Sequence, residues 1–533
     1  MLRYNPDDVA SDKLVHLDTI SGKSLTYGGL RKRAAHCAWG LRNKLGLQVQ
    51  QIMLVFAPNC TDFVLLAHAI WWSGAVLSPL NTASTVKDIE HVLNLVGPTH
   101  IAVAPPFVEK VIEAIRGSKL AGSRAPTLCT LLERHGDLPL FPEDVEGTSS
   151  AESLPPWDLD GMSSKEAVSS VCFSSGTTGL IKGVKLSHYS QIMNMIQLRV
   201  SMPTRIHSGM REVFFPPFGH IYGVAIIMLT GMWVGAFFCT MPSFDLPTYC
   251  ALMQRHRATD MHIVPPVALL LTTSPIAQSH DLSSVRNIMV TAAPLKPALQ
   301  TKLLTRFPDA DIYQGYGMTE TCPALTSQHH LTATNIGSVG KLVTMTEARL
   351  VDPSTGVDVR DGEEGEMWVK GPQVMMGYIN DAAATRAAFS DDGWLRTGDI
   401  LRRDGNGDYW VTDRLKEMVK YKGFQVAPSE LEDLLLGHPD VVDAAVCGVY
   451  VEAEATEVPV AYVSLVEGKA GVVGEERRRV LEGIRGWLDG RVGGYKRLRG
   501  GVHHLQELPK TPSGKILRRE LPAKVKAARM AKL

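Results

Sequence analysis

Residues 168–184 read Val-Ser-Ser-Val-Cys-Phe-Ser-Ser-Gly-Thr-Thr-Gly-Leu-Ile-Lys-Gly-Val. The apolar, β-branched run at 168–173 predicts a buried strand. Six small residues and then Lys182 follow it: Ser174, Ser175, Gly176, Thr177, Thr178 and Gly179. Glycines let backbone N–H groups approach a ligand, and hydroxyls and a lysine add donors and charge, which suits a polyphosphate. A solvated surface turn has the same composition, and no Walker spacing closes the loop, so the rest of the chain must decide.

The bulk composition is that of an ordinary globular protein. A chain of 533 residues is too long for one core and should form two or more domains. Lys+Arg and Asp+Glu balance at 55 each, so no net charge favours nucleic acid or an anionic membrane. The eight cysteines are scattered singly without Cys-x-x-Cys, which is typical of reduced, intracellular thiols.

Two segments bear on whether the chain enters a membrane, the N-terminus and one long apolar stretch. Residues 1–8 are polar and acidic, unlike a secretory signal. Residues 224–241 are nearly all apolar, but Gly231 and Gly235 interrupt them. We interpret them as a buried helix running into a buried strand, with a transmembrane span as the alternative.

Helical and strand patterns alternate along the first half of the chain. Helical spacing covers residues 30–45 and 63–72, and short apolar strands are expected at 52–57, 76–80 and 100–104. This rhythm predicts parallel α/β sheets. Residues 117–166 are rich in Ser, Pro, Gly, Asp and Glu and are expected to form a surface loop, with or without short helices, that leads to the central strand.

The later part of the chain changes character. Residues 339–366 carry short strand patterns and turn residues, which suits a small β-rich subdomain. Residues 404–408 should form a tight turn between two strands. One amphipathic helix is expected where Val480, Leu481, Ile484, Trp487 and Leu488 share a face.

Five further stretches belong with the opening loop. They are Pro-Pro-Phe-Gly-His-Ile-Tyr-Gly (216–223), Gln-Gly-Tyr-Gly-Met-Thr-Glu (314–320), Gly-Trp-Leu-Arg-Thr-Gly-Asp (393–399), Asp-Arg-Leu-Lys-Glu-Met-Val-Lys-Tyr-Lys-Gly-Phe-Gln-Val (413–426) and Pro-Lys-Thr-Pro-Ser-Gly-Lys-Ile-Leu (509–517). In this order the six motifs resemble the adenylate-forming superfamily of acyl-CoA synthetases, luciferases and peptide-synthetase adenylation domains. Within it, the chain looks most like the 4-coumarate–CoA ligase and luciferase branch. The resemblance runs from about residue 25 to the C-terminal lysine motif.

The resemblance implies an α/β fold in three parts. A large N-terminal domain, residues 1–412, would hold parallel α/β sheets, a small β-rich subdomain and the ATP and acid sites. Residues 413–416 would be a hinge. Residues 417–533 would form a small, mobile α+β domain that carries the catalytic lysines.

The ATP site follows from the same motifs. By resemblance the 174–179 loop and Lys182 would hold the β- and γ-phosphates, although the family usually has proline where this chain has Ile181. Tyr316 offers a flat face for adenine, Thr319 a donor to the α-phosphate, and Glu320 a hard oxygen ligand for Mg²⁺. The alternative for Tyr316 is a plain core tyrosine, and the alternative for Thr319 and Glu320 is a helix cap. The remaining nucleotide contacts implied are Gln314, Gly315, Asp399 at the ribose hydroxyls, Arg414 and Lys416.

Three lysines, one glycine and one histidine are the implied catalytic and coenzyme A contacts. Lys515 would reach the oxygen bridging the acid and the α-phosphate, where a fixed ammonium stabilises developing charge. Lys420, Lys422 and Gly423 would act in the second half-reaction, the lysines near the acyl-adenylate and the glycine along the pantetheine tunnel. His220 would stand at the mouth of the acid pocket; its alternative is a satisfied core histidine.

The implied acid pocket is lined by Ile221, Tyr222, Ala225, Thr291, Ala292, Gly317, Pro323, Ala324 and Leu325. Coumarate-type enzymes have asparagine and serine at Ala225 and Ile226, and glycine at Thr291. An apolar pocket without those donors favours an unsubstituted aryl acid or an aliphatic acid over a hydroxycinnamate. Ser243 replaces a basic residue that often meets coenzyme A.

The implied reaction is ATP-dependent ligation of a carboxylic acid to coenzyme A through an acyl-adenylate, within a secondary-metabolite or fatty-acid pathway. Three alternatives stay open. The first is an enzyme that stops at the adenylate or transfers it to an amine, a carrier protein or oxygen; the second is a non-catalytic acyl- or nucleotide-binding relative; the third is a simple ATPase or kinase.

The last three residues suggest a subcellular location. Ala531-Lys532-Leu533 fits the small–basic–leucine peroxisomal signal, so we expect binding to the peroxisomal import receptor. A frayed tail on a cytoplasmic protein is the alternative.

Overall fold

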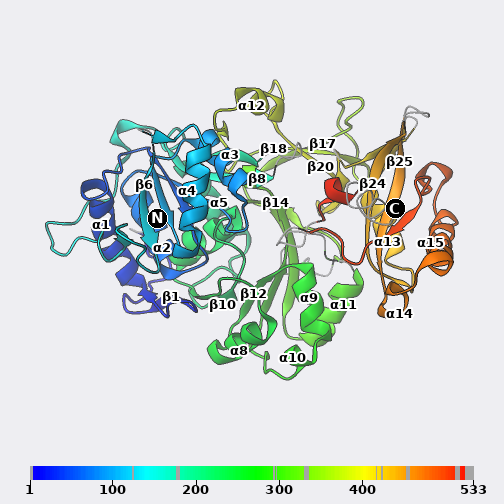
Figure 1. Ribbon diagram of the computed structural model, residues 1–533, viewed down its shortest axis with the longest axis horizontal. Helices are drawn as coiled ribbons and strands as arrows, with labels where there is room; N and C mark the ends of the chain where they lie inside the picture. The colour runs from blue at the N-terminus through cyan, green and yellow to red at the C-terminus, as the bar shows by residue number, and fades with distance from the viewer. Residues whose placement is uncertain are drawn as a thin grey trace. The chain divides into compact units, whose positions relative to one another are not determined.

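Two α/β sheets make up the first part of the chain in the computed structural model (Figure 1). The structure describes residues 4–122, 125–175, 181–291, 295, 297–328, 335–415, 417–421, 424–451, 456–510 and 516–521. Within these ranges it does not describe the side chains of Ser175, Arg414, Lys420, Phe424, Gln425 and Arg519.

The first sheet contains the strand that leads into the 174–179 loop. Its order is β19-β9-β8-β4-β3-β5-β6-β7, and the neighbours from β8 through β4, β3, β5 and β6 to β7 are parallel. The strands are β3 (Ile52–Phe56), β4 (Val76–Pro79), β5 (His100–Val103), β6 (Thr127–Leu131), β7 (Leu140–Phe141), β8 (Val168–Ser175), β9 (Ile181–Ser187) and β19 (Gly377–Tyr378).

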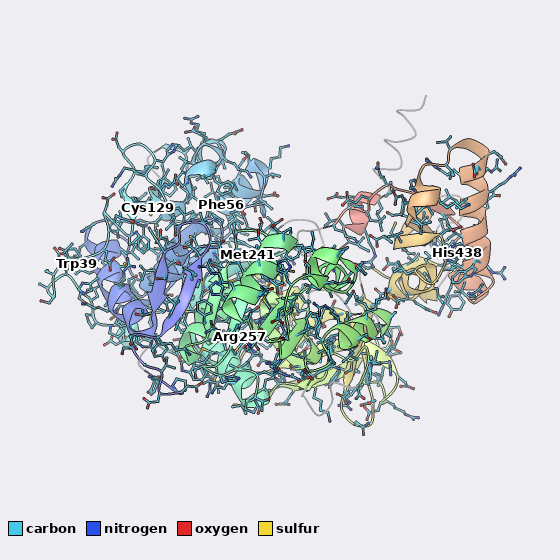
Figure 2. All side chains as sticks on the ribbon, turned by 90° about the horizontal axis from the view of Figure 1, so that it is seen from below. Trp39, Phe56, Cys129, Met241, Arg257 and His438 are labelled. Carbon is cyan, nitrogen blue, oxygen red and sulfur yellow. The ribbon has the colours of Figure 1, made fainter. Side chains whose placement is uncertain are left out.

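Helices between the strands cover this sheet. They are α1 (Tyr27–Asn43), α2 (Thr61–Trp72), α3 (Val86–Val96) and α4 (Val108–Gly117). Apolar residues of α3 and α4 pack on β3, β4, β5 and β8 in one buried cluster, to which Phe56, labelled in Figure 2, belongs. Local chemistry fixes the ends of α3. Thr85 and Asp88 form a capping box, and Gly97 ends the helix at φ 59°, a conformation that glycine adopts without strain.

The second sheet has nine strands in the order β16-β15-β14-β13-β12-β10-β11-β1-β2. They are β1 (Leu14–Asp18), β2 (Ser24–Thr26), β10 (Arg211–Phe214), β11 (Phe237–Thr240), β12 (Asp260–Ile263), β13 (Asn287–Val290), β14 (Asp311–Gly317), β15 (Ala324–Ser327) and β16 (Lys341–Leu342). One face packs against α8 (Leu246–His256), α9 (Pro265–Thr273), α10 (Pro275–Gln278) and α11 (Pro297–Arg306), which Figure 1 shows grouped together.

The apolar stretch at 224–241 folds as its pattern predicts. A continuous helix of three segments, α6 (Ile221–Gly223), the π-helical η4 (Val224–Gly231) and α7 (Met232–Val234), runs into strand β11. Every residue of η4 is buried. Within the described ranges, no helix has both the length and the apolar character needed to cross a bilayer.

The second half of the chain is β-rich. A four-stranded sheet joins β17 (Glu347–Val351), β18 (Glu364–Lys370), β20 (Leu395–Arg403) and β21 (Tyr409–Arg414). A hairpin of β22 (Val419–Tyr421) and β23 (Phe424–Val426) precedes a sheet of β24 (Val441–Val451), β25 (Thr456–Leu465) and β26 (Val502–His504). The helices are α12 (Ala382–Ala388), α13 (Pro428–Leu435), α14 (Glu467–Ala470) and α15 (Gly474–Asp489). The amphipathic face predicted for α15 packs into the core of this last sheet.

Two expectations need correction. The region 117–166 is not only loop, because β6 and β7 lie within it and extend the first sheet. Residues 339–366 do not form one subdomain, because β16 joins the nine-stranded sheet while β17 and β18 pair elsewhere. All eight cysteines are buried free thiols, as their single spacing predicts.

The chain divides into two compact units. The first is Met1–Thr291 with Leu295–Glu347 and Val369–Leu395; the second is Ala292–Pro294 with Ala348–Trp368 and Arg396–Leu533. This division does not test the three-part scheme, so the boundaries 1–412, 413–416 and 417–533 stay a prediction.

Candidate active site

A cluster of polar side chains connects Ser174, the first residue of the 174–179 loop, to the 314–320 motif. Ser174, at the end of β8, donates from Oγ to Oε1 of Glu320 at 3.0 Å, across 146 residues of sequence. The hydroxyl of Tyr378 donates to the same oxygen at 3.0 Å. Glu320 is only 5% exposed, and its Oε2 has no partner among the described residues. One carboxylate oxygen is therefore held by protein hydroxyls and the other is available to a ligand.

The hairpin of β14 and β15 places Glu320. The chain turns after Gly317 into a short 3₁₀ helix, Thr319–Thr321. A Cβ on Gly317 would stand 2.0 Å from the Pro323 carbonyl oxygen, so only glycine fits this close backbone approach. The Met375 amide donates to the Glu320 carbonyl at 2.9 Å, which fixes the backbone from the other side.

Strand β19 brings in Tyr378, which sequence reasoning missed. Tyr378 pairs with Val184 of β9, and Lys182 of β9 pairs with Ser174 of β8. The Lys182 ammonium lies 4.6 Å from the centroid of the Tyr378 ring, a cation–π contact. Burial, and then the Glu320 carboxylate, raise the pKa of Tyr378, so its hydroxyl stays a donor. No motif signals this residue, because sheet pairing alone brings it to the cluster.

Other predicted nucleotide residues lie at the same end of β14. Thr319 is buried, and the Tyr316 amide donates to Thr326 Oγ1 at 3.2 Å. The Gln314 side chain accepts from the Leu295 amide at 2.8 Å and donates to the Ser338 carbonyl at 3.3 Å. Its amide group therefore bonds to the protein itself, and a nucleotide contact from Gln314 stays a prediction.

The helix that starts after His220 carries the front of the predicted acid site. His220 Nδ1 accepts the Tyr222 amide at 3.1 Å and caps the helix. The His220 side chain is accessible to solvent, yet its ring stands among packed residues, which lowers its pKa below the usual value. His220 is therefore neutral at pH 7.

Tyr222 and its neighbours form the inner part of the site. The Tyr222 ring stacks on Phe214 at 6.4 Å between centroids, and its hydroxyl donates to Met289 Sδ at 3.2 Å. Ile221, Ala225 and Leu325 are buried. Asn194 of α5 (His188–Ser201) holds Ala324 with two hydrogen bonds: its Oδ1 accepts from the Ala324 amide at 3.1 Å, and its Nδ2 donates to the Ala324 carbonyl at 3.0 Å.

Asp399 lies in the second unit. It is 4% exposed, and it pairs with Arg414 across the antiparallel β20–β21 ladder. The partnership of Arg414 with Asp399 at the ribose stays a prediction.

The backbone around the predicted lysines is partly described. Lys420 lies in β22, opposite Gln425 of β23. Lys510 and Ile516 flank residues 511–515 and form an isolated antiparallel bridge. Nearby in the sequence, Arg518 forms an ion pair with Glu432 through Nη2 at 2.7 Å and a second ion pair with Glu417. The predicted functional residues that lie outside the described ranges are Gly176, Thr177, Thr178, Gly179, Ala292, Lys416, Lys422, Gly423, Lys515 and the tail Ala531-Lys532-Leu533.

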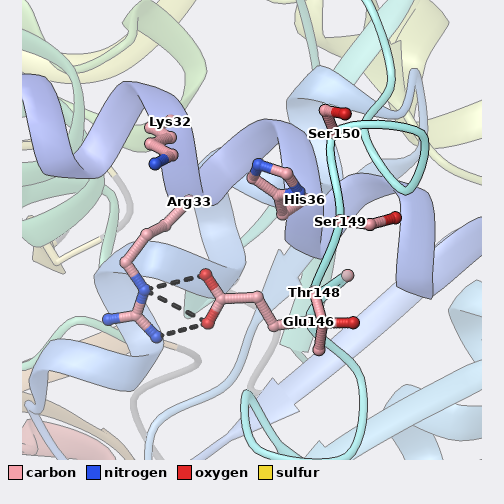
Figure 3. Close-up of a pocket in the computed structure, with 8 residues that line it drawn as sticks. Lys32, Arg33, His36, Glu146, Thr148, Ser149 and Ser150 are labelled. Atoms are coloured by element: carbon pink, nitrogen blue, oxygen red, sulfur yellow. Dashed lines mark hydrogen bonds and ion pairs between the residues drawn. The ribbon is translucent and has the colours of Figure 1, made fainter.

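Two surface hollows contain none of the predicted site residues. One, of about 410 Å³, lies between α1 and residues 146–150. Figure 3 shows the Arg33 guanidinium forked onto Glu146 there, at 2.7 Å for Nη2, so this cation is already paired. The other, of about 530 Å³, is lined by Arg211, Arg255, His256, Arg257, Thr259, Ser284 and Arg286.

The fold and the polar cluster around Glu320 together indicate the class of protein. This is an α/β protein whose polar groups gather where β8 and β14 end, the edge at which such sheets bind ligands. The family model described as AMP-binding enzyme matches residues 3–379, and that of the AMP-binding enzyme C-terminal domain matches residues 430–515. The chain belongs to the AMP-binding enzyme family.

Curated relatives agree with the motif resemblance. The 4-coumarate:CoA ligase 1 of Petunia hybrida is 34% identical over 509 residues, covering 94% of this chain and 89% of that protein. The 4-coumarate–CoA ligase 2 of Oryza sativa subsp. japonica is 34% identical over 527 residues, covering 95% and 89%. The predicted family and the enzyme class, an AMP-forming acyl-CoA ligase, are confirmed.

Solved structures agree with the fold. ATP-bound MatB from Rhodopseudomonas palustris aligns with a TM-score of 0.84 at 25% identity, covering 98% of each chain. The anthranilate CoA ligase AuaEII in complex with anthranoyl-AMP aligns with a TM-score of 0.84 at 25% identity, covering 98% of this chain and 96% of that one. The predicted α/β architecture with a smaller C-terminal part is confirmed.

Proposed function

We propose that this chain activates a carboxylic acid with ATP and transfers it to coenzyme A. The acid's carboxylate oxygen attacks the α-phosphate, and pyrophosphate leaves with the electrons of the α–β bridge. The coenzyme A thiol then attacks the acyl carbon, loses its proton, and AMP leaves. The observation that carries the proposal is the hydrogen bond from Ser174 to Glu320, which joins the two motifs expected to hold ATP.

The nucleotide contacts proposed are those of the motifs. Ser174, Ser175, Gly176, Thr177, Thr178 and Gly179, with Lys182, hold the terminal phosphates; Gln314, Gly315, Tyr316 and Thr319 hold the adenosine and the α-phosphate; Asp399, Arg414 and Lys416 hold the ribose. Lys182 is already oriented by the ring of Tyr378. Binding energy of this kind positions the α-phosphate for in-line attack.

Glu320 is the proposed magnesium ligand. Mg²⁺ is usually held by one or two carboxylates together with substrate phosphates and water, and Glu320 Oε2 is one such oxygen. Among the described residues, no three His, Cys, Asp or Glu side chains gather to hold a metal ion without a substrate. Bound there, the ion would neutralise phosphate charge.

The catalytic lysines divide between the two half-reactions. Lys515 stabilises the charge that develops during adenylation. Lys420 and Lys422 serve thioester formation, and Gly423 leaves room for the pantetheine arm. His220, neutral by virtue of its surroundings, stands at the entrance of the acid site and orients the carboxylate.

The acid would bind along Ile221, Tyr222, Ala225, Thr291, Ala292, Gly317, Pro323, Ala324 and Leu325. Coenzyme A as acceptor is supported by the names of the relatives. Transfer to an amine or a carrier protein is the second candidate, since Ser243 stands where a basic contact to coenzyme A is common, and an amide bond synthetase, McbA from Marinactinospora thermotolerans, shares the fold at a TM-score of 0.80.

One screen tests this function. The full chain is incubated with MgATP and carboxylic acids from acetate to long-chain and aryl acids, with and without coenzyme A, and pyrophosphate and thioester are both measured. We expect acid-dependent pyrophosphate release in both conditions and thioester only with coenzyme A. Pyrophosphate without thioester for every active acid would favour another acceptor; phosphate release that ignores the acid would refute the function.

We also propose a peroxisomal address through Ala531-Lys532-Leu533, with the cytoplasm as the alternative. A fluorescent protein fused to the N-terminus leaves the tail free for imaging beside a peroxisome marker. Punctate signal that disperses when Leu533 is deleted would support the address, and diffuse fluorescence of the intact tail would refute it.

A further inference from the structure

A charged pair lies inside the nine-stranded sheet, beneath the predicted acid site. Glu212 of β10 is 1% exposed and His262 of β12 is 7% exposed. His262 Nδ1 lies 2.7 Å from Glu212 Oε2, and the His262 backbone amide donates to Glu212 Oε1 at 3.0 Å. Buried ionisable groups are expensive unless they are paired, so a polar couple here needs a reason.

The pair fixes the proton state of the histidine. Burial alone would lower the pKa of His262, but the Glu212 carboxylate, with Asp260 behind it, raises it above the usual value. Two nearby tyrosines, Tyr222 beside the ring and Tyr313 two strands away, stay neutral because burial raises the pKa of both hydroxyls. Paired with the Glu212 carboxylate at 2.7 Å, the protonated form of His262 donates from Nδ1 to Glu212 and has a second donor, Nε2–H.

Among the described residues, that second donor has no protein acceptor. The ring of His262 bonds to Glu212 through Nδ1, its backbone amide donates to the same carboxylate, and Nε2 has no hydrogen bond within the described ranges. His262 is 7% exposed, and Nε2 is not among the fully buried side-chain atoms that lack a partner, so solvent or a ligand can reach it. A bound molecule with an acceptor at this place would replace water as the partner of this donor.

The neighbours of His262 belong to the acid site. The ring of Tyr222, a predicted pocket residue, stands edge-on to His262 at 5.7 Å between centroids. His262 is directly beside Met289 in the ladder, and Met289 Sδ accepts from the Tyr222 hydroxyl. The methyl carbon of Met289 lies 3.0 Å from where a Cβ on Gly315 would stand. His262, Met289, Tyr222 and Gly315 thus line one continuous face.

The depth of His262 sets which end of the acid it would meet. Through the ladder, His262 is level with Met289 and then with Tyr313 of β14. Tyr316 lies three residues further along β14, which is about 10 Å at the usual rise per residue. The carboxylate reacts near Tyr316 and Glu320, so His262 lies at the remote end of the acid.

We propose that His262 is a subsite for an oxygen acceptor, a hydroxyl or carbonyl group, at the end of the acid remote from its carboxylate. His262 is the residue that determines this specificity, and Glu212 is a positioning residue that holds its ring and charge. The subsite rests on the proposed function. It replaces the expectation of an unsubstituted acid, which considered only the donors missing at Ala225 and Ile226.

Matched acid pairs test the subsite. We compare acids that differ only by a terminal hydroxyl or carbonyl group, such as benzoate with 4-hydroxybenzoate and 4-formylbenzoate, cinnamate with its 4-hydroxy form, and hexanoate with 6-hydroxyhexanoate. Pyrophosphate release gives kcat/KM for each. For the pair of matching length, the wild type should favour the oxygenated acid by 10- to 100-fold, as expected when a hydrogen-bonding site meets an analogue that lacks the group.

Two variants at His262 separate recognition from folding. His262→Leu should reduce the preference to below about twofold, chiefly by raising KM for the oxygenated acid. His262→Gln keeps an N–H donor of similar reach and should retain part of the preference. A wild type that accepts both members of every pair equally, or a His262→Leu enzyme that keeps the preference, overturns the subsite.

Glu212→Gln tests the positioning role through pH. Removing the carboxylate lowers the pKa of His262, so at pH 8 its ring becomes neutral, and Nε2 turns from donor to acceptor when Nδ1 keeps the proton. The preference for a carbonyl group, which only accepts, should fall about tenfold between pH 6 and pH 8 in the variant and stay flat in the wild type. A flat profile in the variant contradicts the role of Glu212. Failure of every acid to release pyrophosphate would instead refute the proposed function.

Discussion

At the scale of single residues, the site depends on how the two oxygens of Glu320 are used. Ser174 and Tyr378 donate to Oε1, so the carboxylate is fixed before any substrate arrives. Preorganised charge of this kind costs no rearrangement during the reaction. The carboxylate can then act through Oε2 alone.

Glu320→Gln tests this division. Glutamine keeps the shape and can still accept from both hydroxyls, but it removes the charge that would hold a metal ion. We expect pyrophosphate release to fall by about 10²–10³-fold, with a raised requirement for Mg²⁺.

The matched control is Tyr378→Phe, which removes one donor to Oε1 and leaves the charge. Loss of one such hydrogen bond should cost a factor of about 10 or less. Equal losses in the two variants would mean that Glu320 is structural and not a ligand.

Motifs are the only sequence signal for single residues of the candidate site. Ser174 and Glu320 stand in motifs and share a hydrogen bond in the structure, and Lys182 contacts the ring of Tyr378, whose hydroxyl bonds to the same carboxylate. Tyr378 does not stand in one, and His262 looks like any histidine in an apolar run. Their roles arise from pairing between strands far apart in the chain, which local spacing does not encode.

At the scale of elements, the β14–β15 hairpin sets the position of the 314–320 motif. The backbone of Gly317 passes so close to the Pro323 carbonyl that any side chain would collide with it. The hairpin therefore depends on one glycine.

Gly317→Ala should displace the hairpin or strain it. Overpacking of this kind typically costs about 1–3 kcal/mol of unfolding free energy, and the shift should also lower the rate of adenylation. Urea unfolding and pyrophosphate release check the two effects. Gly405→Ala is the control, because a Cβ there meets nothing within 4 Å and should leave both quantities nearly unchanged. A fully stable and active Gly317→Ala enzyme would show that the close approach is not required.

Element predictions succeeded where the pattern was long and failed where burial came from neighbours. The helix and strand at 224–241 and the amphipathic helix α15 follow their apolar periodicity. Strand β6 was missed because it is five residues long amid polar sequence, and its burial comes from pairing with β5. Strand β16 was assigned to the wrong neighbours because a two-residue strand carries no information about its partner.

At the scale of the whole molecule, buried histidines limit stability in acid. His16 and His68 are 0% and 2% exposed, and burial lowers their pKa values to about 4 and about 3. In the unfolded chain both would titrate near 6.5. Between these pH values the unfolded state binds protons on both histidines and the folded state does not. The free energy of unfolding therefore falls as the pH drops below 6.5 toward the folded pKa values.

Each of the two histidines should cost roughly 2 kcal/mol between pH 7 and pH 5. Urea unfolding at several pH values gives the slope. His68→Leu removes one titrating group whose Nε2 is buried without a partner, and should flatten the slope by its share. An unchanged slope would mean that His68 is not buried neutral.

The proposed division of the two half-reactions between two lysine motifs of the C-terminal part also concerns the whole molecule. Lys515 and Lys420 lie in separate segments: residue 515 falls between Lys510 and Ile516, which pair with each other, and Lys420 belongs to the β22–β23 hairpin. If each motif serves one half-reaction, each lysine should be dispensable for the other. Lys515→Ala should reduce acid-dependent pyrophosphate release by orders of magnitude and still form thioester from synthetic acyl-adenylate.

Lys420→Ala should show the reverse, with normal pyrophosphate release and slow transfer from preformed acyl-adenylate to coenzyme A. A bulky side chain in place of Gly423 should reproduce the Lys420 result by blocking the thiol's path. Both steps are measured in both variants, by pyrophosphate release and by thioester formation from preformed adenylate. Because the charge lost is the same in the two lysine variants, a non-specific effect of removing one cation would lower both steps equally in both, and that outcome contradicts the division.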